Sequence, residues 1–238
     1  MSGSARTGVS GLLPDFDPRR MPLVARDHDL PAVPAERLAT AALRARLSSP
    51  PVWTPELSGD PPWRPSGTPR PAAVLVPIVA HAHGPTILLT QRSAHLRGHA
   101  GQVAFPGGGC DPQDRDPTDT ALREAHEEVG LERQRVEILT LLPPYLTGSG
   151  YLVTPVVGLV TPGFALHLDR FEVAEAFEVP LAFLMDPRHH ERRSIVLPGS
   201  IERQFYAMPW HDPQNEREHF IWGATAAMLR NLYRLLSA

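Results

Sequence analysis

Hydrophobic runs separated by short polar segments predict alternating strands and helices over residues 70–238. Nearly continuous apolar runs are typical of buried strands, whereas apolar residues spaced three and four apart are typical of helices. The expected strands are 72–80, 86–91, 136–142, 151–160, 194–197 and 203–207. Pro77 lies inside the first of these strands, and because proline cannot donate to a sheet ladder we expect a bulge or an edge position there.

The pattern also predicts two helices in this region, over 117–129 and 220–236. The residues expected on the core face of the second helix are Ile221, Thr225, Met228, Leu229 and Leu232. The first helix has recognisable ends, with Asp116 as N-cap, Pro117 as first helical residue and Gly130 as C-terminal stop. Its apolar stripe consists of Ala121, Leu122, Ala125 and Val129.

Proline distinguishes the first part of the chain from the rest. Thirteen of the 27 prolines fall within the first 71 residues, and this density excludes long helices and central strands. We therefore expect a proline-rich N-terminal arm over 1–69 and one globular domain over 70–238.

Within the arm, one helix is expected after Pro34, over residues 35–47. The small and apolar residues on one side of that helix are Leu38, Ala42 and Ala45. The segment that follows is predicted to be an extended connector. Trp53 and Trp63 are candidates for docking it onto the domain, and a loosely ordered arm is the alternative.

Three carboxylates lie beside the apolar stripe of the helix at 117–129. At roughly 100° per residue, Glu124 and Glu128 point only about 40° apart, and Glu127 lies further round the same side. Like charges this close repel one another, so the arrangement does not serve helix stability. Hard divalent cations such as Mg²⁺ prefer such oxygen ligands, often completed by a substrate phosphate. The alternative is a solvated acidic face.

A glycine loop precedes this helix and favours the metal interpretation. Phe105, Pro106 and three glycines, Gly107 to Gly109, follow an apolar run. Because glycine tolerates unusual backbone conformations, such a loop can bring main-chain groups close to a metal ion or a phosphate.

The segment Arg123–Leu131, REAHEEVGL, resembles the second half of the Nudix box. The resemblance implies an α+β fold, a mixed sheet sandwiched between helices, and hydrolysis of nucleoside diphosphate derivatives with Mg²⁺ or Mn²⁺. It implies Glu124, Glu127 and Glu128 as metal ligands and catalytic residues. The first half departs from the general box, because the position of its structural glutamate is taken by Asp114, and we expect Asp114 to pair with Arg123.

The segment upstream of the box resembles the extra signature of the coenzyme A pyrophosphatase branch of that family, which also has this longer box. The resemblance implies substrate-binding roles for Arg92, Ser93, Arg97, Gly101, Phe105, Gly107 and Gly108. The planar fork of an arginine suits the phosphates of coenzyme A. Ordinary surface ion pairs are the alternative for Arg92 and Arg97.

A second acidic stretch, FEVAEAFEVPLAFL, contains Glu172, Glu175 and Glu178. In Nudix proteins a comparable stretch supplies a further metal ligand or the catalytic base, and Glu175 is our candidate. The alternative is a solvated helical turn. Glu124 or Glu175 would then be the base.

Composition narrows the remaining possibilities. A net charge of −3 gives no reason to expect nucleic-acid binding. A single cysteine, Cys110, suits a reducing compartment. No segment approaches the roughly 20 apolar residues of a membrane span, and the first 20 residues contain no signal-like apolar stretch, so we expect a cytoplasmic protein. The sequence leaves a homodimer open. His189 and His190, in a polar loop, are expected to be exposed.

The leading hypothesis is metal-dependent hydrolysis of coenzyme A and its derivatives to 4′-phosphopantetheine, or its acyl form, and adenosine 3′,5′-bisphosphate. One alternative is the same chemistry on another diphosphate, such as ADP-ribose or a dinucleotide. The other is a non-catalytic Nudix domain that senses a nucleotide.

Overall fold

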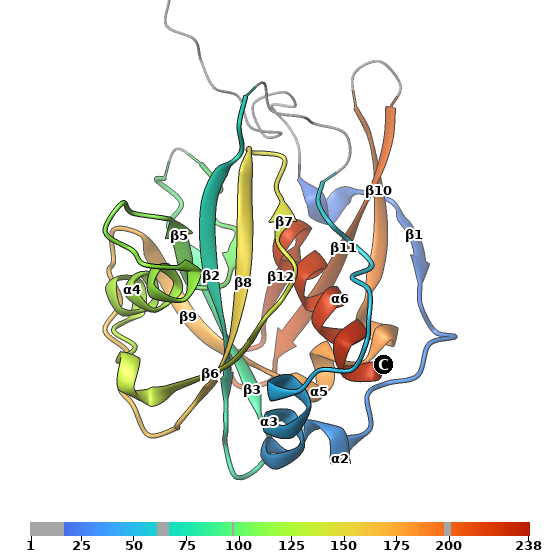
Figure 1. The fold of residues 1–238 in the computed structure, drawn as a ribbon. Helices are drawn as coiled ribbons and strands as arrows, with labels where there is room; N and C mark the ends of the chain where they lie inside the picture. Colours follow the sequence, from blue (N-terminus) through green and yellow to red (C-terminus); the bar gives the residue numbers. More distant parts are fainter. Residues whose placement is uncertain (1–16, 61–66, 97, 198–200) are drawn as a thin grey trace, which may run out of the picture.

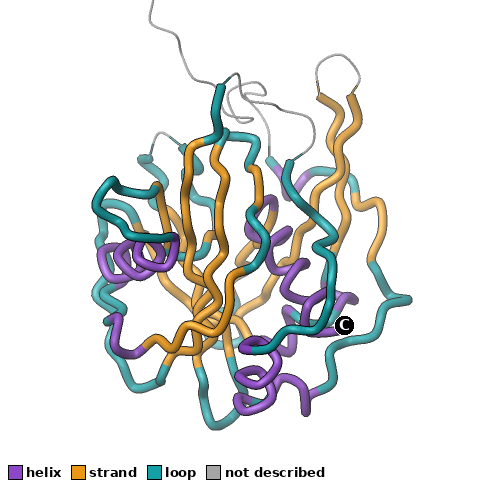
Figure 2. The backbone as a smooth tube through the Cα atoms, viewed as in Figure 1, coloured by secondary structure: helices purple, strands orange, loops and turns teal. Residues whose placement is uncertain are grey.

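The computed structural model describes residues 17–60, 67–96, 98–197 and 201–238. Strands in these residues form two sheets (Figures 1 and 2). The larger sheet contains β2 (Arg70–Val79), β3 (Thr86–Arg92), β4 (Val103–Ala104), β5 (Gly107–Gly109), β6 (Val136–Leu141), β7 (Tyr145–Leu146), β8 (Tyr151–Val160) and β9 (Val173–Pro180). The smaller sheet contains β1 (Leu23–Arg26), β10 (Glu191–Leu197), β11 (Ile201–Asp212) and β12 (Arg217–Trp222).

Helices connect and cover these strands. The α-helices are α2 (Ala35–Leu38), α3 (Thr40–Ser48), α4 (Pro117–Val129), α5 (Leu181–Leu184) and α6 (Gly223–Ser237). Short 3₁₀ turns are η1 (Pro18–Arg20), η2 (Arg133–Arg135) and η3 (Pro187–His189). None of the helices in the described ranges is long and apolar enough to cross a membrane.

The larger sheet is mixed and has helices on both faces. β2 runs parallel to β8 and antiparallel to β3 and β5. Side chains alternate along β2, so Ala73 and Leu75 pack with the apolar stripe of α4, while Val76 and Ile78 pack with α6 on the other face. The predicted α+β fold with a mixed sheet between helices is confirmed (Figure 1).

Pro77 marks neither a bulge nor an edge strand, contrary to our expectation. It lies in β2, the middle strand of the larger sheet, opposite Gly158 of β8. On its other side β2 pairs with β5 over Ala72–Val74 and with β3 only at Ile78 and Val79. The proline therefore occupies the interval between two partner strands, where a missing amide hydrogen removes no ladder bond.

The N-terminal segment is packed into the molecule. Leu43 and Leu47 of α3 are fully buried in the same hydrophobic cluster as α6. The expected helix is broken at Ala39, whose extended backbone separates α2 from α3. Its buried side consists of Leu38, Leu43 and Leu47, so the predicted stripe with Ala42 and Ala45 was wrong. Trp53 packs against the core as expected, and Trp63 lies outside the described residues.

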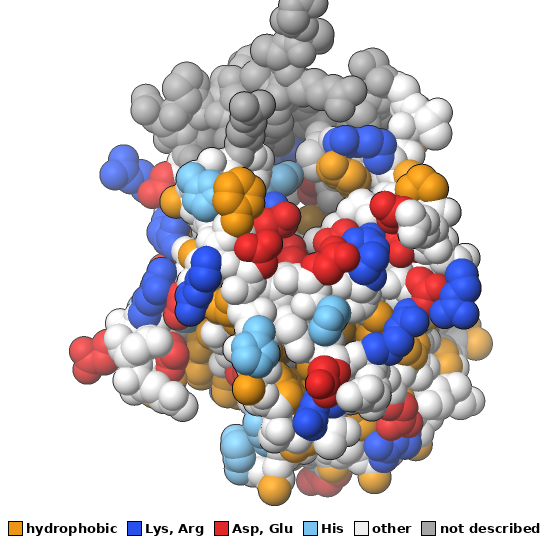
Figure 3. Space-filling model, turned by 90° about the vertical axis from the view of Figure 1, so that its left-hand side faces the viewer, with side chains coloured by type: hydrophobic (Ala, Val, Ile, Leu, Met, Phe, Trp, Pro, Cys, Tyr) orange, Lys and Arg blue, Asp and Glu red, His pale blue; other side chains and the backbone are white. Residues whose placement is uncertain are grey.

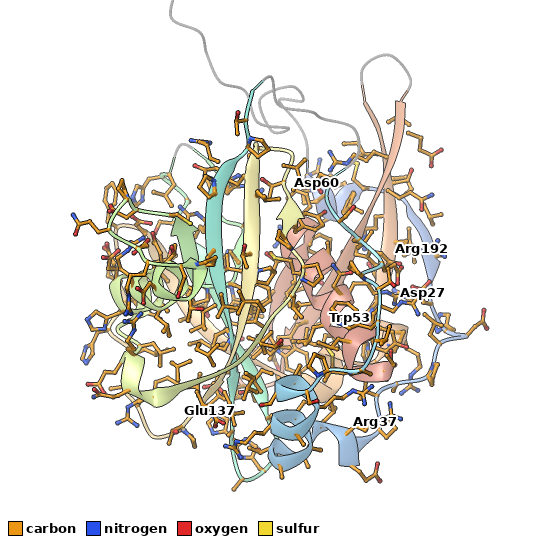
Figure 4. The ribbon with its side chains drawn as sticks, viewed as in Figure 1. Asp27, Arg37, Trp53, Asp60, Glu137 and Arg192 are labelled. Atoms are coloured by element: carbon orange, nitrogen blue, oxygen red, sulfur yellow. The ribbon has the colours of Figure 1, made fainter. Side chains whose placement is uncertain are left out.

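Polar contacts fix this segment to the C-terminal helix. Arg230 of α6 is 1% exposed and forms ion pairs with Asp27 at 3.0 Å and with Glu56 at 2.8 Å. Arg37 of α2 donates to the last carbonyl oxygens of the chain, including that of Ser237 at 3.2 Å. Figure 4 shows Asp27 beside Arg192 of β10, and their side chains are 3.3 Å apart. Burial of such charges is tolerated because each has a partner.

Three further expectations need correction. Residues 220–222 end strand β12, and the final helix starts at Gly223. The acidic stretch around Glu175 forms strand β9, paired with β3, so the helical-turn alternative was wrong. His190 is fully buried, not exposed, and both ring nitrogens have partners: Nε2 lies 2.8 Å from the carbonyl oxygen of Leu184 and Nδ1 lies 3.1 Å from Nη1 of Arg230.

Candidate active site

Helix α4 carries the acidic residues, and its two ends are fixed as the sequence predicts. The side chain of Asp116 accepts a hydrogen bond from the backbone N–H of Asp119 at 2.9 Å. Gly130 adopts the left-handed conformation, with φ 71°. Its N–H donates to the carbonyl oxygens of Ala125 and His126 in the last turn of the helix. Ala121 and Ala125 are fully buried against the larger sheet. The rotation of the helix about its axis is thereby set, and with it the direction of the glutamates.

One arginine organises the outer part of the acidic stripe. Arg123 donates two hydrogen bonds to Asp114, at 3.0 and 2.9 Å, so the expected partners lie together. The same guanidinium contacts Glu124 at 2.9 Å and Glu127 at 3.0 Å. Its Nη2 also donates to the carbonyl oxygen of Gly109 at 3.2 Å. Arg123 therefore ties the loop, the helix and two of the carboxylates into one unit.

The glycine loop lies directly against the carboxylates. The N–H of Gly107 donates to Oε2 of Glu128 at 3.2 Å. A Cβ atom placed on Gly108 would lie 2.6 Å from the carboxylate of Glu124. A Cβ on Gly107, whose φ is 159°, would meet the carbonyl oxygen of Ala73 at 2.5 Å. Any larger residue at these two positions would displace the carboxylates or the central strand.

Burial controls the electrostatics of the two inner glutamates. Glu128 is 4% exposed, and burial raises its pKa to about 7, with the charges of Glu124 and Glu172 acting in the same direction. The hydrogen bond from Gly107 and the charge of Arg92 oppose this shift. Burial also raises the pKa of Glu124. The buried Glu128 and the partly buried Glu124 repel each other, so a positive charge placed between them would be favourable.

Arg92 and Glu172 complete the group. Arg92, at the end of β3, places Nη1 3.5 Å from Glu128 and Nη2 3.9 Å from Glu172. The second acidic stretch thus contributes Glu172 to the cluster. Our candidate from the sequence, Glu175, instead forms an ion pair with Arg217 of β12 at 2.6 Å. We refer to Glu124, Glu128, Glu172 and Arg92 as the carboxylate cluster.

The remaining residues of the upstream signature have different positions. Ser93 is buried, and its N–H donates to the carbonyl oxygen of Glu172 at 2.8 Å. Gly101, with φ 69°, donates its N–H to the carbonyl oxygen of Arg92 at 3.1 Å and so closes the loop that starts there. Phe105 is 3% exposed and belongs to the hydrophobic core. Arg97 lies outside the described residues.

Figure 3 looks onto the side of the molecule that carries α4. Acidic side chains gather near the centre of this face, beside a hollow, with basic and histidine side chains around them.

Residues 69–198 match the family described as the NUDIX domain. The chain belongs to the Nudix family. It is 46% identical over 172 residues to a protein of Photorhabdus laumondii named "Uncharacterized Nudix hydrolase NudL", covering 72% of this chain and 88% of the relative. A protein of the same name from Pectobacterium atrosepticum is 46% identical over 182 residues, which is 74% of this chain and 88% of that one.

Among solved structures, a MutT/nudix family protein from Enterococcus faecalis is similar to this one with a TM-score of 0.44 and 18% identity. The similarity covers 73% of this chain and 64% of that structure. The Nudix assignment thus comes from the sequence relationships. As a Nudix hydrolase, the protein acts on a nucleoside diphosphate derivative, a small-molecule substrate.

Nudix hydrolases generally use divalent metal ions such as Mg²⁺ or Mn²⁺. In the described residues, no three His, Cys, Asp or Glu side chains form a metal-binding group as they stand. Arginines hold the carboxylates instead, Arg123 on Glu124 and Arg92 on Glu128. The donor set nevertheless fits such an ion, because its groups are carboxylate oxygens and the two inner ones, the buried Glu128 and the partly buried Glu124, repel each other.

Proposed function

We propose that this protein hydrolyses the pyrophosphate bond of coenzyme A and its derivatives, with Mg²⁺ or Mn²⁺. The products are 4′-phosphopantetheine, or its acyl form, and adenosine 3′,5′-bisphosphate. The observation that carries the proposal is the position of Arg92. This residue of the coenzyme A signature lies within the carboxylate cluster, 3.5 Å from Glu128, where a phosphate held by the cluster would meet its guanidinium.

The proposed ligands of the ion are Glu124, Glu127 and Glu128. When bound, the ion supplies polarisation of the phosphoryl oxygens and activation of water. Arg123 orients Glu124 and Glu127 through the contacts at 2.9 and 3.0 Å. Gly107 orients Glu128 through its N–H. The chain thus fixes each carboxylate before the substrate arrives, which is the usual requirement for electrostatic catalysis.

A carboxylate must also accept the proton of the attacking water. Glu124 and Glu172 are our candidates, because Glu124 lies against Gly108 of the glycine loop and Glu172 lies 3.9 Å from Arg92. Glu175 is less suitable, since its carboxylate is already held by Arg217. The hydrogen bond from the N–H of Ser93 to the carbonyl oxygen of Glu172 keeps Glu172 beside Arg92.

The substrate assignment rests on the resemblance of the segment from Leu88 to Gly108 to the coenzyme A branch, and on where that segment lies. The loop in this segment begins after Arg92. Its far end returns to Arg92, whose N–H donates to the carbonyl oxygen of Gln102 at 2.9 Å. Residues of the loop are therefore next to the proposed position of the diphosphate. One cysteine in the whole chain supports a reducing compartment, the cytoplasm.

A panel of purified substrates tests the assignment. We expect metal-dependent turnover of coenzyme A with a higher kcat/KM than that of ADP-ribose or a dinucleotide. A kcat/KM at least about tenfold higher for ADP-ribose would reject coenzyme A while leaving the hydrolase chemistry in place. Binding of nucleotides without turnover of any of them would favour the sensing alternative.

A further inference from the structure

Phe171 is the one aromatic residue among the large hydrophobic side chains that are exposed in the described part of the chain, with 67% of its surface accessible. The other members of that group are Leu23, Val24, Val52, Leu141, Leu152 and Val196. A single exposed hydrophobic side chain needs no special explanation. Phe171 differs from the others because it lies on a hydrogen-bonded turn beside the carboxylate cluster.

Hydrogen bonds fix the turn that presents this ring. The side chain of Asp169 accepts from the N–H of Phe171 at 2.8 Å, and its backbone carbonyl accepts from the N–H groups of Glu172 and Val173. The turn is joined to the end of β3 by the bond from Ser93 to Glu172. These bonds fix the backbone of the turn that carries the exposed ring.

A second ring lies beside the first. His95, in the loop after β3, is exposed, and its ring centroid lies 4.9 Å from that of Phe171, with the planes at 58°. Both rings adjoin the carboxylate cluster, because Glu172 follows Phe171 directly and lies 3.9 Å from Arg92. The edge of the candidate active site thus carries two exposed aromatic rings.

We propose that Phe171, with His95 beside it, is the stacking platform for the nucleobase of the substrate. A nucleoside diphosphate joins a flat aromatic base to the diphosphate, so a diphosphate at the cluster would bring the base to the adjoining surface. Bases stack readily on aromatic side chains, and a purine offers the larger face. The ligand class is therefore a purine nucleoside diphosphate. The inference rests on the proposed function, since it needs the diphosphate at the carboxylate cluster.

Binding measurements separate the base from the diphosphate. ADP and inorganic pyrophosphate are titrated calorimetrically into the full-length protein with Ca²⁺ in place of Mg²⁺ or Mn²⁺. We expect Phe171→Ala to weaken ADP about tenfold, within the range that loss of one stacked base produces, and to change pyrophosphate by less than about twofold. Val196→Ala is the matched control, since Val196 is 63% exposed on β10, and it should change neither ligand.

A spectroscopic variant gives an independent readout. The fluorescence that Phe171→Trp adds to that of the four native tryptophans should be quenched by ADP and unaffected by pyrophosphate. Equal effects of Phe171→Ala on ADP and pyrophosphate binding, or an unchanged affinity for ADP, would overturn the stacking proposal. Either result would leave the proposed diphosphate site standing. A wild-type protein that binds neither ligand would overturn the diphosphate site and the platform together.

Discussion

The guanidinium of Arg92 lies 3.5 Å from the carboxylate of Glu128, a residue that is 4% exposed. The distance is that of an ion pair without a close hydrogen bond, so the arginine compensates part of the buried charge. In our account it balances Glu128 until a divalent ion arrives, and it then contacts a substrate phosphate.

This relationship predicts opposite effects of one substitution on two ligands. Because Arg92→Gln removes a cation that competes for Glu128, it should tighten Mn²⁺ binding without substrate by about fivefold, an effect of about 1 kcal/mol. The same variant should raise KM for coenzyme A. Electron paramagnetic resonance of free Mn²⁺ measures the first quantity, and steady-state kinetics measure the second. Weaker Mn²⁺ binding would instead give Arg92 the role of positioning Glu128.

Adjacent glycines provide a test of the loop geometry with a built-in control. A methyl group on Gly108 would lie 2.6 Å from the carboxylate of Glu124, whereas one on Gly109 would have no atom within 4 Å. Gly108→Ala should therefore lower kcat by about a hundredfold, a loss of about 2.7 kcal/mol in transition-state stabilisation. Gly109→Ala should stay within about twofold of wild type. Similar kinetics for the two variants would contradict the close approach of loop and helix.

The contact of Glu56 with the C-terminal helix predicts a pH dependence of stability. Burial raises the pKa of Glu56, but hydrogen bonds from Arg230, Tyr206 and Arg234 outweigh it and lower the pKa from 4.5 to about 2. The ionised form is thus favoured in the folded state. Its contribution to the free energy of unfolding is present above pH 4.5 and is lost as pH falls towards 2.

Glu56→Gln should accordingly lower the free energy of unfolding by about 2 kcal/mol at pH 7, from the conversion of 1.36 kcal/mol per pKa unit and allowing for partial exposure. The difference from wild type should shrink below pH 4.5. Urea unfolding at several pH values measures it. A difference that does not depend on pH would mean that the carboxylate has no such role in joining the N-terminal segment to α6.

The sequence predicts those features of the structure that depend on residues close together in the chain. Helix α4 was predicted with both ends, because its cap residues Asp116 and Gly130 act locally. The same spacing argument identified Glu124 and Glu128 as neighbours. The buried Leu43 was missed, because helix α3 follows a break at Ala39 that shifts its apolar side.

The second acidic stretch shows what local patterns cannot supply. From the sequence our candidate in this stretch is Glu175, whereas the structure brings Glu172 to the cluster. Their positions follow from the pairing of β3 with β9, in which Gln91 lies opposite Glu175 and the register shifts before Arg92. That irregularity leaves Glu172 beside the cluster and turns Glu175 towards Arg217. Strand register depends on tertiary packing, and a single sequence does not reveal a one-residue shift.

The substitution Glu128→Gln tests the central claim, that the carboxylates of α4 form a metal-dependent catalytic site. Removing a buried charge should slightly raise the melting temperature of the metal-free protein at pH 8, because burial opposes ionisation of Glu128. The exposed Glu36 of α2 provides the control variant, Glu36→Gln, which should resemble wild type. Mn²⁺ should stabilise wild type and Glu36→Gln more than Glu128→Gln.

The deciding measurement is kcat for coenzyme A, or for the best substrate of the panel, in Glu128→Gln beside Glu36→Gln under saturating Mn²⁺. The account predicts a loss of at least about a hundredfold in Glu128→Gln, which corresponds to about 2.7 kcal/mol for one lost ligand. Glu36→Gln should keep the wild-type rate. A folded Glu128→Gln variant with near-wild-type kcat would contradict the account.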